Sequence, residues 1–312
     1  MSKDSRVVAG IDCGTNSVRL LVAEIDDDGI VREKARLMRI VRLGEGVDRV
    51  GEFSEEALSR TFAALDEYVA VIRDERVVQT RFVATSASRD VSNREAFVAG
   101  VRTRMGVDPE VISGDEEASL SFVGALRGLP PGLATVPALV LDIGGGSTEF
   151  VLGPRNPLQS RSVDIGCVRM TERHLQSDPP TVAEVAAAEL GIAAGVKAAS
   201  AVVPFEDATC LIGLAGSVTT VAAMAMDLDR YDADRLHGSV IEFADVHGVT
   251  ETLIAMTRAE RAALPFMHPG RVDVIAAGAM ILRAAMIAGG FRQVIVSETD
   301  ILDGIVYSMT PS

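Results

Sequence analysis

One segment constrains this chain more than any other: an apolar run that ends in an aspartate and three consecutive glycines. The sequence ALVLDIGGGSTEFVL occupies residues 138–152, and it delivers Asp142 into the glycines at 144–146. Glycines let the backbone approach an anion closely, and the hydroxyl groups of Ser147 and Thr148 add hydrogen-bond donors. The pattern therefore predicts a strand-turn-strand unit that binds phosphate, and a plain hairpin without a ligand is the alternative.

Two acidic side chains flank this turn. Asp142 precedes the glycines, and Glu149 follows the hydroxyl residues. Hard divalent cations prefer carboxylate oxygens as ligands, and such a cation would hold phosphate oxygens against the turn. We therefore expect a metal ion beside the bound phosphate.

The same design occurs near the N-terminus, where IDCGTNSVRLLV at residues 11–22 again sends a strand into Asp, Gly and Ser. At one shared offset, the alignment pairs Asp12 with Asp142, Gly14 with Gly144 and Ser17 with Ser147. One copy alone would be a weak motif, but two copies in register indicate a duplicated domain. The expected arrangement has two phosphate loops that face each other across a cleft.

Length and composition favour a globular protein. The chain has 312 residues, which suits two domains of about 150 residues each. Hydrophobic residues make up 48% and charged residues 24%, which excludes a disordered chain. A net charge of -14, with 4% aromatic residues and no Trp, argues against nucleic-acid binding. A phosphate ligand must then be attracted by groups close to it, which outweigh the negative charge of the protein as a whole, because charges more than about 8–10 Å away are screened by salt.

Cysteine use and hydropathy indicate the compartment. The three cysteines, Cys13, Cys167 and Cys210, lie far apart, which fits a reducing compartment and neither a disulfide framework nor a zinc site. The polar N-terminus leads directly into a strand, so we expect no signal peptide. The apolar segment 274–290 contains Arg283, so it predicts a buried helix rather than a membrane span. We expect a cytoplasmic protein without membrane contact.

Strands and helices alternate in both halves of the chain. In the first half we expect an extended segment at 30–43, a helix that Ser54 opens, a strand at 81–84, a helix at 93–105 and a strand at 109–112. In the second half we expect an extended segment at 160–164, a helix with a capping box at Thr181 and Glu184, and a strand at 209–213. The segment PPGLATVP at 130–137 gives the expected domains 1–131 and 132–312.

A third candidate phosphate loop follows the strand at 209–213. The sequence GLAGSVTTVAAM runs from Gly213 into a helix-forming segment, which puts free N–H groups at a helix N-terminus, where anions bind. A tight packing turn between strand and helix explains these residues equally well.

The segment ISGDEEASLSF at 112–122 contains the candidate general base. Ser113 and Glu116 have the spacing of a capping box, which assigns Glu116 to the helix start. Glu117 has no such structural role, so it could orient a water molecule for attack on phosphorus. By spacing alone, a solvated surface carboxylate is the more frequent explanation of such a residue.

Arg89 is the candidate phosphate clamp. It follows the strand at 81–84, and loops at strand ends carry the sites of open α/β sheets. A contact with phosphoryl oxygens is one role, and a surface ion pair with Asp90 or Glu95 is the other.

Taken in order, the segments resemble one family. Six segments look like motifs of the exopolyphosphatase and guanosine pentaphosphate phosphohydrolase (Ppx/GppA) family, in the actin-like ATPase superfamily. They are IDCGTNSVRLL, VATSASRD, VISGDEEASLSFVGA, LVLDIGGGSTEFVLG, DIGCVRMTE and GLAGSVTT. The resemblance extends over nearly the whole chain, because the segments HPGRVDVIAAGAMIL and SETDILDGI also match the family. The short two-domain actinobacterial members are the nearest likeness. The resemblance implies an α/β fold of two actin-like (ribonuclease H-like) domains. Each would have a mixed five-stranded sheet flanked by helices, with the active site in the interdomain cleft.

The resemblance also implies a role for each matched residue. Glu117 would be the general base or water-positioning carboxylate, and Arg89 a phosphate clamp. Mg²⁺ or Mn²⁺ would be bound by Asp142, Glu149 and Glu117. The three phosphate loops would consist of Asp12, Gly14, Thr15, Asn16 and Ser17; of Gly144, Gly145, Gly146, Ser147 and Thr148; and of Gly216, Ser217 and Thr219.

The implied activity is that of an exopolyphosphatase, which hydrolyses the terminal phosphoanhydride of inorganic polyphosphate and releases orthophosphate. Guanosine pentaphosphate is the alternative substrate, because it presents the same terminal group to the same loops. Two other classes stay open: a sensor that binds polyphosphate or guanosine pentaphosphate without turnover, and a kinase of the same fold, which would need an adenosine pocket and an acceptor site. The resemblance further implies a homodimer.

Overall fold

The computed structural model describes residues 5–89 and 91–310, and the contacts within it divide the chain into two compact units. Of the described residues, those up to 124 and those from 301 onward form the first unit, and residues 125–300 form the second. The sequence analysis expected one boundary near residue 131. The difference lies in the last helix, α13 (Ile301–Tyr307), whose Leu302 and Val306 pack against strand β1 (Arg6–Cys13) and its neighbour in the first unit.

A mixed sheet of five strands forms the centre of the first unit, in the order β3-β2-β1-β4-β5. Strand β1 pairs antiparallel with β2 and parallel with β4. The other bounds are β2 Ser17–Ile25, β3 Val31–Ile40, β4 Gln79–Ala84 and β5 Glu110–Val111. This sheet matches the strands that the sequence predicts.

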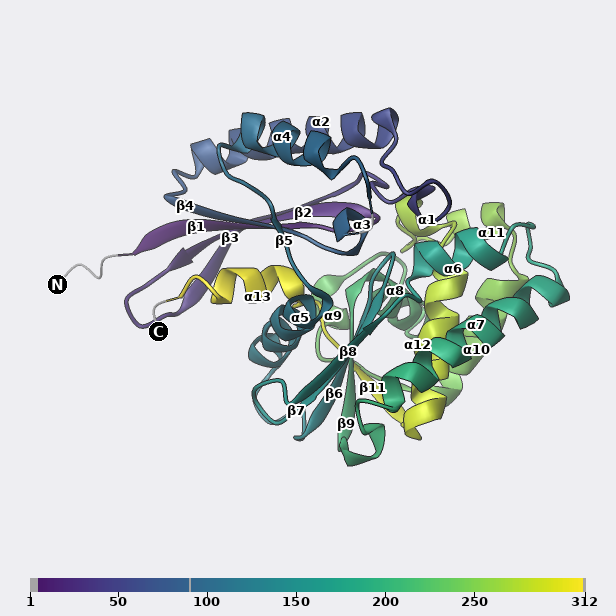
Figure 1. Ribbon diagram of the computed structural model, residues 1–312. Coiled ribbons are helices and arrows are strands. Elements are labelled where there is room, and N and C mark those ends of the chain that lie inside the picture. Colours follow the sequence, from purple (N-terminus) through teal and green to yellow (C-terminus); the bar gives the residue numbers. More distant parts are fainter. Residues whose placement is uncertain (1–4, 90, 311–312) are drawn as a thin grey trace. The chain divides into compact units, whose positions relative to one another are not determined.

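Helices cover both faces of this sheet (Figure 1). On one face, α2 (Glu55–Asp74) and α4 (Arg94–Met105) share a core with Ala9 and Ile11 of β1. On the other face, α13 and the first part of α5 (Gly114–Gly128) pack together through Leu120, Ile301 and Ile305. Side chains alternate along a strand, so Asp12 belongs to the α13 face. Two short helices, α1 (Val47–Val50) and α3 (Ser86–Arg89), lie in the loops.

The second unit has a six-stranded sheet in the order β10-β11-β9-β6-β7-β8. The bounds are β6 Ala138–Ile143, β7 Thr148–Gly153, β8 Gln159–Val163, β9 Cys210–Leu214, β10 Val240–Glu242 and β11 Gln293–Val296. Strands β8, β7, β6, β9 and β11 repeat the order of the first sheet, as a duplicated domain requires. The expectation of five strands was wrong for this unit, because β10 adds an antiparallel edge strand on β11. With three residues, β10 is too short for an alternating pattern to indicate it.

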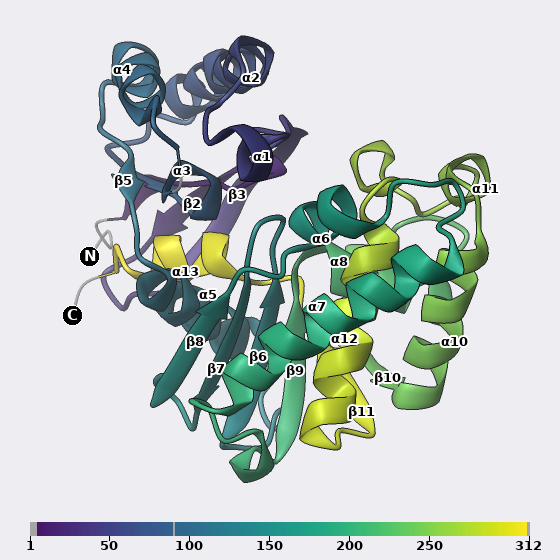
Figure 2. The ribbon, with the colours of Figure 1, turned by 45° about the vertical axis from the view of Figure 1, so that its right-hand side comes forward.

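A layer of helices packs on one face of the second sheet (Figure 2). Its main members are α6 (Cys167–His174), α7 (Val182–Ser200), α8 (Ala215–Ala225), α10 (Phe243–Ala255) and α12 (Ile275–Gly289). The short elements of the unit are α9 (Ala233–Leu236), α11 (Arg258–Ala262), η1 (Phe205–Asp207) and η2 (Pro269–Arg271). The capping box predicted for Thr181 and Glu184 is present at the start of α7.

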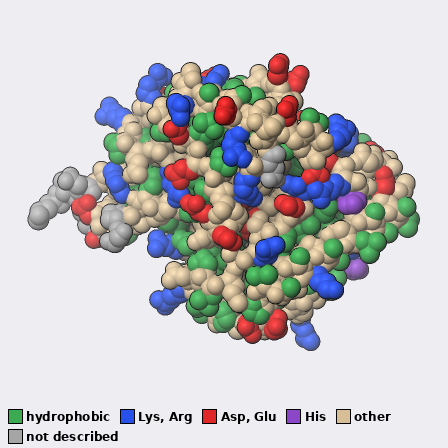
Figure 3. Space-filling model, in the orientation of Figure 1, with side chains coloured by type: hydrophobic (Ala, Val, Ile, Leu, Met, Phe, Trp, Pro, Cys, Tyr) green, Lys and Arg blue, Asp and Glu red, His purple; other side chains and the backbone are tan. Residues whose placement is uncertain are grey.

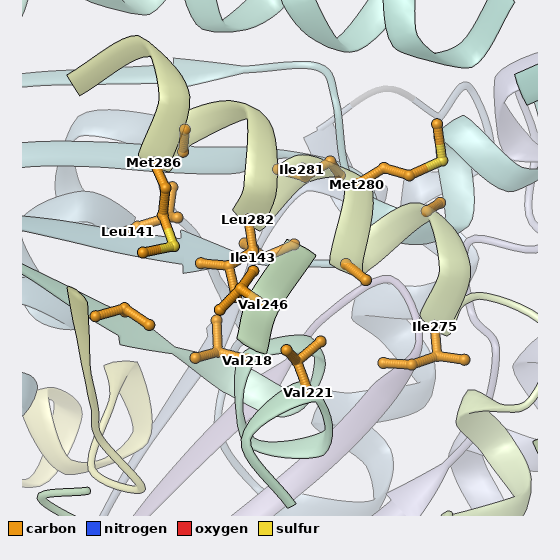
Figure 4. Close-up of a cluster of buried hydrophobic side chains, with 14 of the residues drawn as sticks. Leu141, Ile143, Val218, Val221, Val246, Ile275, Met280, Ile281, Leu282 and Met286 are labelled. Atoms are coloured by element: carbon orange, nitrogen blue, oxygen red, sulfur yellow. The ribbon is translucent and has the colours of Figure 1, made fainter. Parts of the chain in front are cut away.

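Helix α12 lies at the centre of this core, where its Leu282 and Met286 lie on the side of Leu141 of β6 and Val218 of α8 (Figure 4). Arg283 of the same helix is 7% exposed, and its guanidinium forms ion pairs with Glu189 and Glu251. The prediction of a buried helix is therefore confirmed. Within residues 5–89 and 91–310, no helix is long and apolar enough to cross a membrane.

Candidate active site

The two hairpins predicted from the sequence have the same turn. The backbone N–H of Gly14 donates to the carbonyl of Ser17 at 2.9 Å, and that of Gly144 donates to the carbonyl of Ser147 at 3.0 Å. In both units the hairpin lies beside a parallel strand, β4 or β9, which leads directly into a helix. The alignment of Asp12 with Asp142 is therefore confirmed as a structural repeat.

The two hairpins differ in the residue opposite the aspartate. In the first unit Arg19 faces Asp12 across the strands, and the distance from its Nη2 to Oδ2 of Asp12 is 2.6 Å. In the second unit Glu149 occupies the corresponding position and faces Asp142. Residues directly opposite on antiparallel strands have Cβ atoms about 4.5–5.5 Å apart. The second hairpin thus pairs two carboxylates where the first pairs a carboxylate with a guanidinium.

The carboxylate pair suits a divalent cation. Asp142 and Glu149 are 7% and 1% exposed, and both lie on the sheet face opposite the core that contains Leu141 and Phe150. Oγ of Ser162 donates to Oε1 of Glu149 at 2.6 Å, which fixes the direction of that carboxylate. In the described ranges no group of three or more His, Cys, Asp or Glu residues could hold a metal ion. This donor set fits Mg²⁺, which often takes one or two carboxylates and completes its shell with water and phosphate oxygens.

The start of α6 holds the carbonyl groups of the triple-glycine turn. Gly144 O accepts from Cys167 N at 2.9 Å, Gly145 O from Val168 N at 2.9 Å, and Gly146 O from Nε of Arg169 at 2.8 Å. Among the residues that the structure describes, no acceptor binds the backbone N–H groups of Gly145 and Gly146. A turn with bound carbonyls and open N–H groups is a cradle for an anion.

The first loop is held in a similar way by the segment after β3. Thr15 O accepts from Gly44 N at 2.8 Å, and Asn16 O accepts from Val41 N at 3.0 Å. The hydroxyl oxygens of Thr15 and Ser86 are 2.9 Å apart, which ties the loop to α3. The predicted loop residues Asp12, Gly14, Thr15, Asn16 and Ser17 are thus adjacent and firmly supported.

The third predicted loop lies beside the second one. A Cβ placed on Gly278 would lie 2.2 Å from Oγ of Ser217 and 3.6 Å from Cβ of Cys167, so these residues are in contact. Burial raises the pKa of the Cys167 thiol, and a hydrogen bond with Ser217 opposes this shift. Because the N–H of Cys167 also binds Gly144, the loops at 144–148 and 215–219 share one structural support.

Two predicted phosphate-binding hydroxyls already have partners inside the second unit. Oγ1 of Thr148 donates to the carbonyl of Ile165 at 3.1 Å. Oγ1 of Thr219 lies 2.8 Å from the phenol oxygen of Tyr231, which lies 2.5 Å from Oε1 of Glu298. A phenol has one hydrogen and a carboxylate only accepts, so Tyr231 donates to Glu298 and Thr219 donates to Tyr231. In this structure, both threonine hydroxyls support the loops.

Glu117 and Arg89 meet in the first unit. Glu117 is 8% exposed, and its Oε2 lies 2.8 Å from Nη1 of Arg89. The same guanidinium nitrogen donates to the carbonyl of Ile112 at 3.2 Å. The sequence predicted that both residues belong to the site, although it did not indicate that they pair with each other. The alternative partner Asp90 lies outside the described residues.

The neighbouring Glu116 has a different role from the one expected. Oγ of Ser113 accepts from its backbone N–H at 3.2 Å, which is half of the predicted capping box. Its carboxylate, however, binds Nη2 of Arg81 at 2.7 Å. Arg81 comes from β4, so a long-range ion pair directs this carboxylate away from the helix start.

The sequence analysis did not identify Arg271 as a neighbour of the third loop. A Cβ on Gly216 would lie 2.1 Å from Cζ of Arg271, and Nη1 of Arg271 donates to Oγ1 of Thr220 at 3.2 Å. This guanidinium adds positive charge beside the loop. The segment HPGR was part of the family resemblance and was the available signal, although the spacing alone gave it no role.

Two repeated units with matching sheets and glycine turns have the actin-like ATPase fold. The chain belongs to the Ppx/GppA phosphatase family, whose model matches residues 21–312.

Close relatives support this assignment. A protein of Mycobacterium tuberculosis named exopolyphosphatase 2 is 47% identical over 314 residues, which cover 97% of this chain and 98% of that protein. The crystal structure of an exopolyphosphatase-like protein has a TM-score of 0.94 at 41% identity and covers 99% of this chain and 98% of that chain. An Aquifex aeolicus member of the Ppx/GppA family has a TM-score of 0.81 at 30% identity, with 98% of this chain and 97% of that chain covered.

Proposed function

We propose that this protein is an exopolyphosphatase that hydrolyses the terminal phosphoanhydride of inorganic polyphosphate and releases orthophosphate. The observation that carries the proposal is the second hairpin, where open backbone N–H groups at Gly145 and Gly146 lie next to the facing carboxylates of Asp142 and Glu149. An anion cradle beside a cation site suits a terminal phosphoryl group with its metal ion. The name of the mycobacterial relative supports the same substrate.

In this proposal each group has a defined task. The N–H groups of the glycine turn bind oxygens of the terminal phosphoryl group and orient it. Asp142 and Glu149 would hold Mg²⁺ or Mn²⁺, which neutralises phosphate charge when bound. Glu117, the third predicted metal ligand, accepts a proton from water and orients the oxygen for in-line attack on phosphorus. The bond to the bridging oxygen breaks, orthophosphate leaves, and the chain shortens by one unit.

Arg89 has two possible partners in this reaction. Its contact with Glu117 holds the carboxylate in one orientation, and its remaining guanidinium nitrogens suit phosphoryl oxygens. The proposal requires that the groups of both units act on one substrate. It also includes the homodimer and the cytoplasmic location expected from the sequence.

The test is a measurement of orthophosphate release by the purified protein with Mg²⁺ or Mn²⁺. Short-chain polyphosphate, long-chain polyphosphate, guanosine pentaphosphate and ATP are compared as substrates. Glu117→Ala should abolish most turnover, whereas Glu116→Ala is the matched control, since its carboxylate binds Arg81. Release from guanosine pentaphosphate alone would move the protein to that substrate, and tight polyphosphate binding without any release would indicate a sensor.

A further inference from the structure

Helix α5 belongs to both units. It begins at Gly114 and ends at Gly128, and the boundary between the units falls inside it, between Gly124 and Ala125. Its first turn carries Glu117, the proposed general base. An α-helix rises about 1.5 Å per residue and curves only gently. A contact that holds the end of α5 therefore also limits where its first turn can lie.

The last residue of α5 is held by one histidine. Nε2 of His237 lies 3.0 Å from the carbonyl oxygen of Gly128, and Nδ1 of the same ring accepts from the backbone N–H of Glu298 at 3.2 Å. Because Nδ1 accepts, the ring hydrogen is on Nε2, which donates to Gly128. His237 itself follows the short helix α9. One imidazole thus fastens the end of α5 to the segment after β11.

Glu298 connects this histidine with the third phosphate loop. The carboxylate of Glu298 accepts from the phenol of Tyr231, and the phenol oxygen accepts from Oγ1 of Thr219. Thr219 lies near the start of α8, among the predicted phosphate-binding residues. A continuous series of hydrogen bonds therefore runs from the third loop to the end of α5.

A second set of contacts reaches the same loop from its other side. A Cβ on Gly128 would lie 2.0 Å from Oγ1 of Thr299, so the end of α5 packs directly on this side chain. The hydroxyl oxygens of Thr299 and Ser297 are 2.9 Å apart, and Ser297 N donates to the carbonyl of Gly213 at 3.0 Å. Gly213 lies in β9, immediately before the loop. All of these contacts lie inside the second unit.

Fixed contacts of this kind matter because the rate depends on the alignment of the reacting groups. A general base must lie within hydrogen-bond reach of the water that it activates, and a misplacement of about 1 Å can cost roughly 100-fold in rate. On the face that Figure 3 shows, Lys and Arg side chains are interspersed with Asp and Glu side chains, so surface charge there does not favour one alignment of a polyanion. Internal contacts have to supply the alignment.

We propose that His237 is a positioning residue, which fixes the end of α5, the helix that carries Glu117, to the third phosphate loop. It acts through α5 and through Glu298, and it makes no contact of its own with substrate. The inference rests on the proposed function, because it assumes that Glu117 is the base. Phosphate held by the third loop and the base at the start of α5 then act as one assembly.

Two substitutions separate the two contacts of His237. His237→Asn places an acceptor near the position of Nδ1, so it keeps the contact with Glu298, but it is too short to reach Gly128. His237→Gln keeps a donor near the position of Nε2 and loses the contact with Glu298. We expect His237→Asn to lower kcat for orthophosphate release by about 10–100-fold with KM nearly unchanged. His237→Gln should instead mainly raise KM for polyphosphate.

His247→Asn is the matched control, because His247 is exposed on α10 and its ring stacks on Phe243. This variant should keep the native kcat and KM. Gly128→Ala disturbs the second set of contacts by pushing Thr299 away, and it should lower kcat as His237→Asn does. A native kcat in His237→Asn would overturn the proposal. Equal effects of His237→Asn and His237→Gln on kcat and KM would also overturn it, because they would indicate a merely structural role.

Amide hydrogen exchange tests the link without turnover and so separates this inference from the proposed function. In His237→Asn the amides of residues 125–128 should exchange roughly 2–10-fold faster, because one hydrogen bond at the helix end is lost. This exchange pattern in a protein that releases no orthophosphate from any substrate would refute the proposed function and leave the link intact. Native turnover with unchanged exchange in His237→Asn would leave the function in place and refute the link.

Discussion

Nη1 of Arg89 lies 2.8 Å from Oε2 of Glu117, and the two side chains come from separate helices of the first unit. The side chain of Glu117 is 10% exposed and that of Arg89 is 23% exposed, so solvent screens this ion pair only in part. The guanidinium is also held by the carbonyl of Ile112 at 3.2 Å. The arginine therefore orients the proposed general base before any substrate binds.

Replacing Arg89 should separate its two proposed roles. Arg89→Lys keeps the positive charge but loses the fork that contacts Glu117 and phosphoryl oxygens together. We expect kcat for orthophosphate release to fall, by less than the ~10²–10⁴-fold typical of losing a general base in Glu117→Ala. Steady-state kinetics of both variants measure the difference. If Arg89→Lys retains the native kcat with an unchanged KM, the guanidinium neither orients the base nor binds substrate.

Local sequence patterns predicted much of this structure correctly. The turns at Gly14 and Gly144 follow from glycine next to an apolar strand, and the capping box at Thr181 and Glu184 involves neighbours in the chain. Such features depend on a few consecutive residues, so their physical cause is visible in the sequence.

Long-range packing explains what the sequence did not predict. Helix α13 belongs to the first unit because Gly10 has no side chain and therefore lets Ile305 and Val306 approach β1. This contact joins opposite ends of the chain. The same holds for Glu116, whose carboxylate forms an ion pair with Arg81 and does not cap the helix as expected. Tertiary contacts override local preferences at these positions, and a single sequence does not reveal them.

Ser162 should matter for metal binding through Glu149. Its Oγ donates to Oε1 of Glu149 at 2.6 Å, and partners of this kind orient a ligand toward its metal. We expect Ser162→Ala to weaken Mn²⁺ affinity by about 10–100-fold. Isothermal titration calorimetry measures the Mn²⁺ affinity directly, and the Asp142→Asn variant gives the reference loss of affinity when a metal ligand is removed. Native affinity in Ser162→Ala would mean that the Ser162 hydroxyl does not orient a metal ligand.

Tyr231 should support the third loop through Thr219. Tyr231→Phe keeps the ring but removes the hydroxyl that accepts from Thr219 and donates to Glu298. Helix α8 then loses a fixed contact near its start, so we expect a higher KM for polyphosphate with a smaller change in kcat. Thr219→Val, which cannot donate, should give the same phenotype, and the double variant should add little. Additive effects would mean that the two hydroxyls act independently.

His268 should make stability depend on pH. Burial lowers the pKa of its imidazole below the ordinary value of 6.5, and nearby Arg271 adds to this shift. Nδ1 accepts from Gly270 N at 3.1 Å, which requires an unprotonated nitrogen. With a folded-state pKa below the unfolded one, the stabilisation is present above the unfolded pKa and is lost as pH falls through the folded pKa. Urea unfolding at about pH 7.5 and about pH 5.5 should show a larger loss for the native protein than for His268→Asn.

Gly166 should be required for the glycine turn because its neighbour is backbone. A Cβ at this position would lie 2.2 Å from the carbonyl oxygen of Gly145 and 2.4 Å from the nitrogen of Gly146, and neither atom can rotate away. Gly166→Ala should therefore displace the turn, destabilise the second unit by at least the ~1–3 kcal/mol of an overpacked site, and reduce phosphate release.

Gly248→Ala is the matched control for this change. Gly248 lies inside α10, and among the described residues no neighbouring segment comes within 4 Å of the place that a Cβ would take. The same substitution should therefore stabilise the helix by up to about 1 kcal/mol. Thermal unfolding and orthophosphate release of the two variants form the test. Equal stability in both would mean that α6 moves away from Gly145 at little cost, and the rigid support of the anion cradle by α6 would then be disproved.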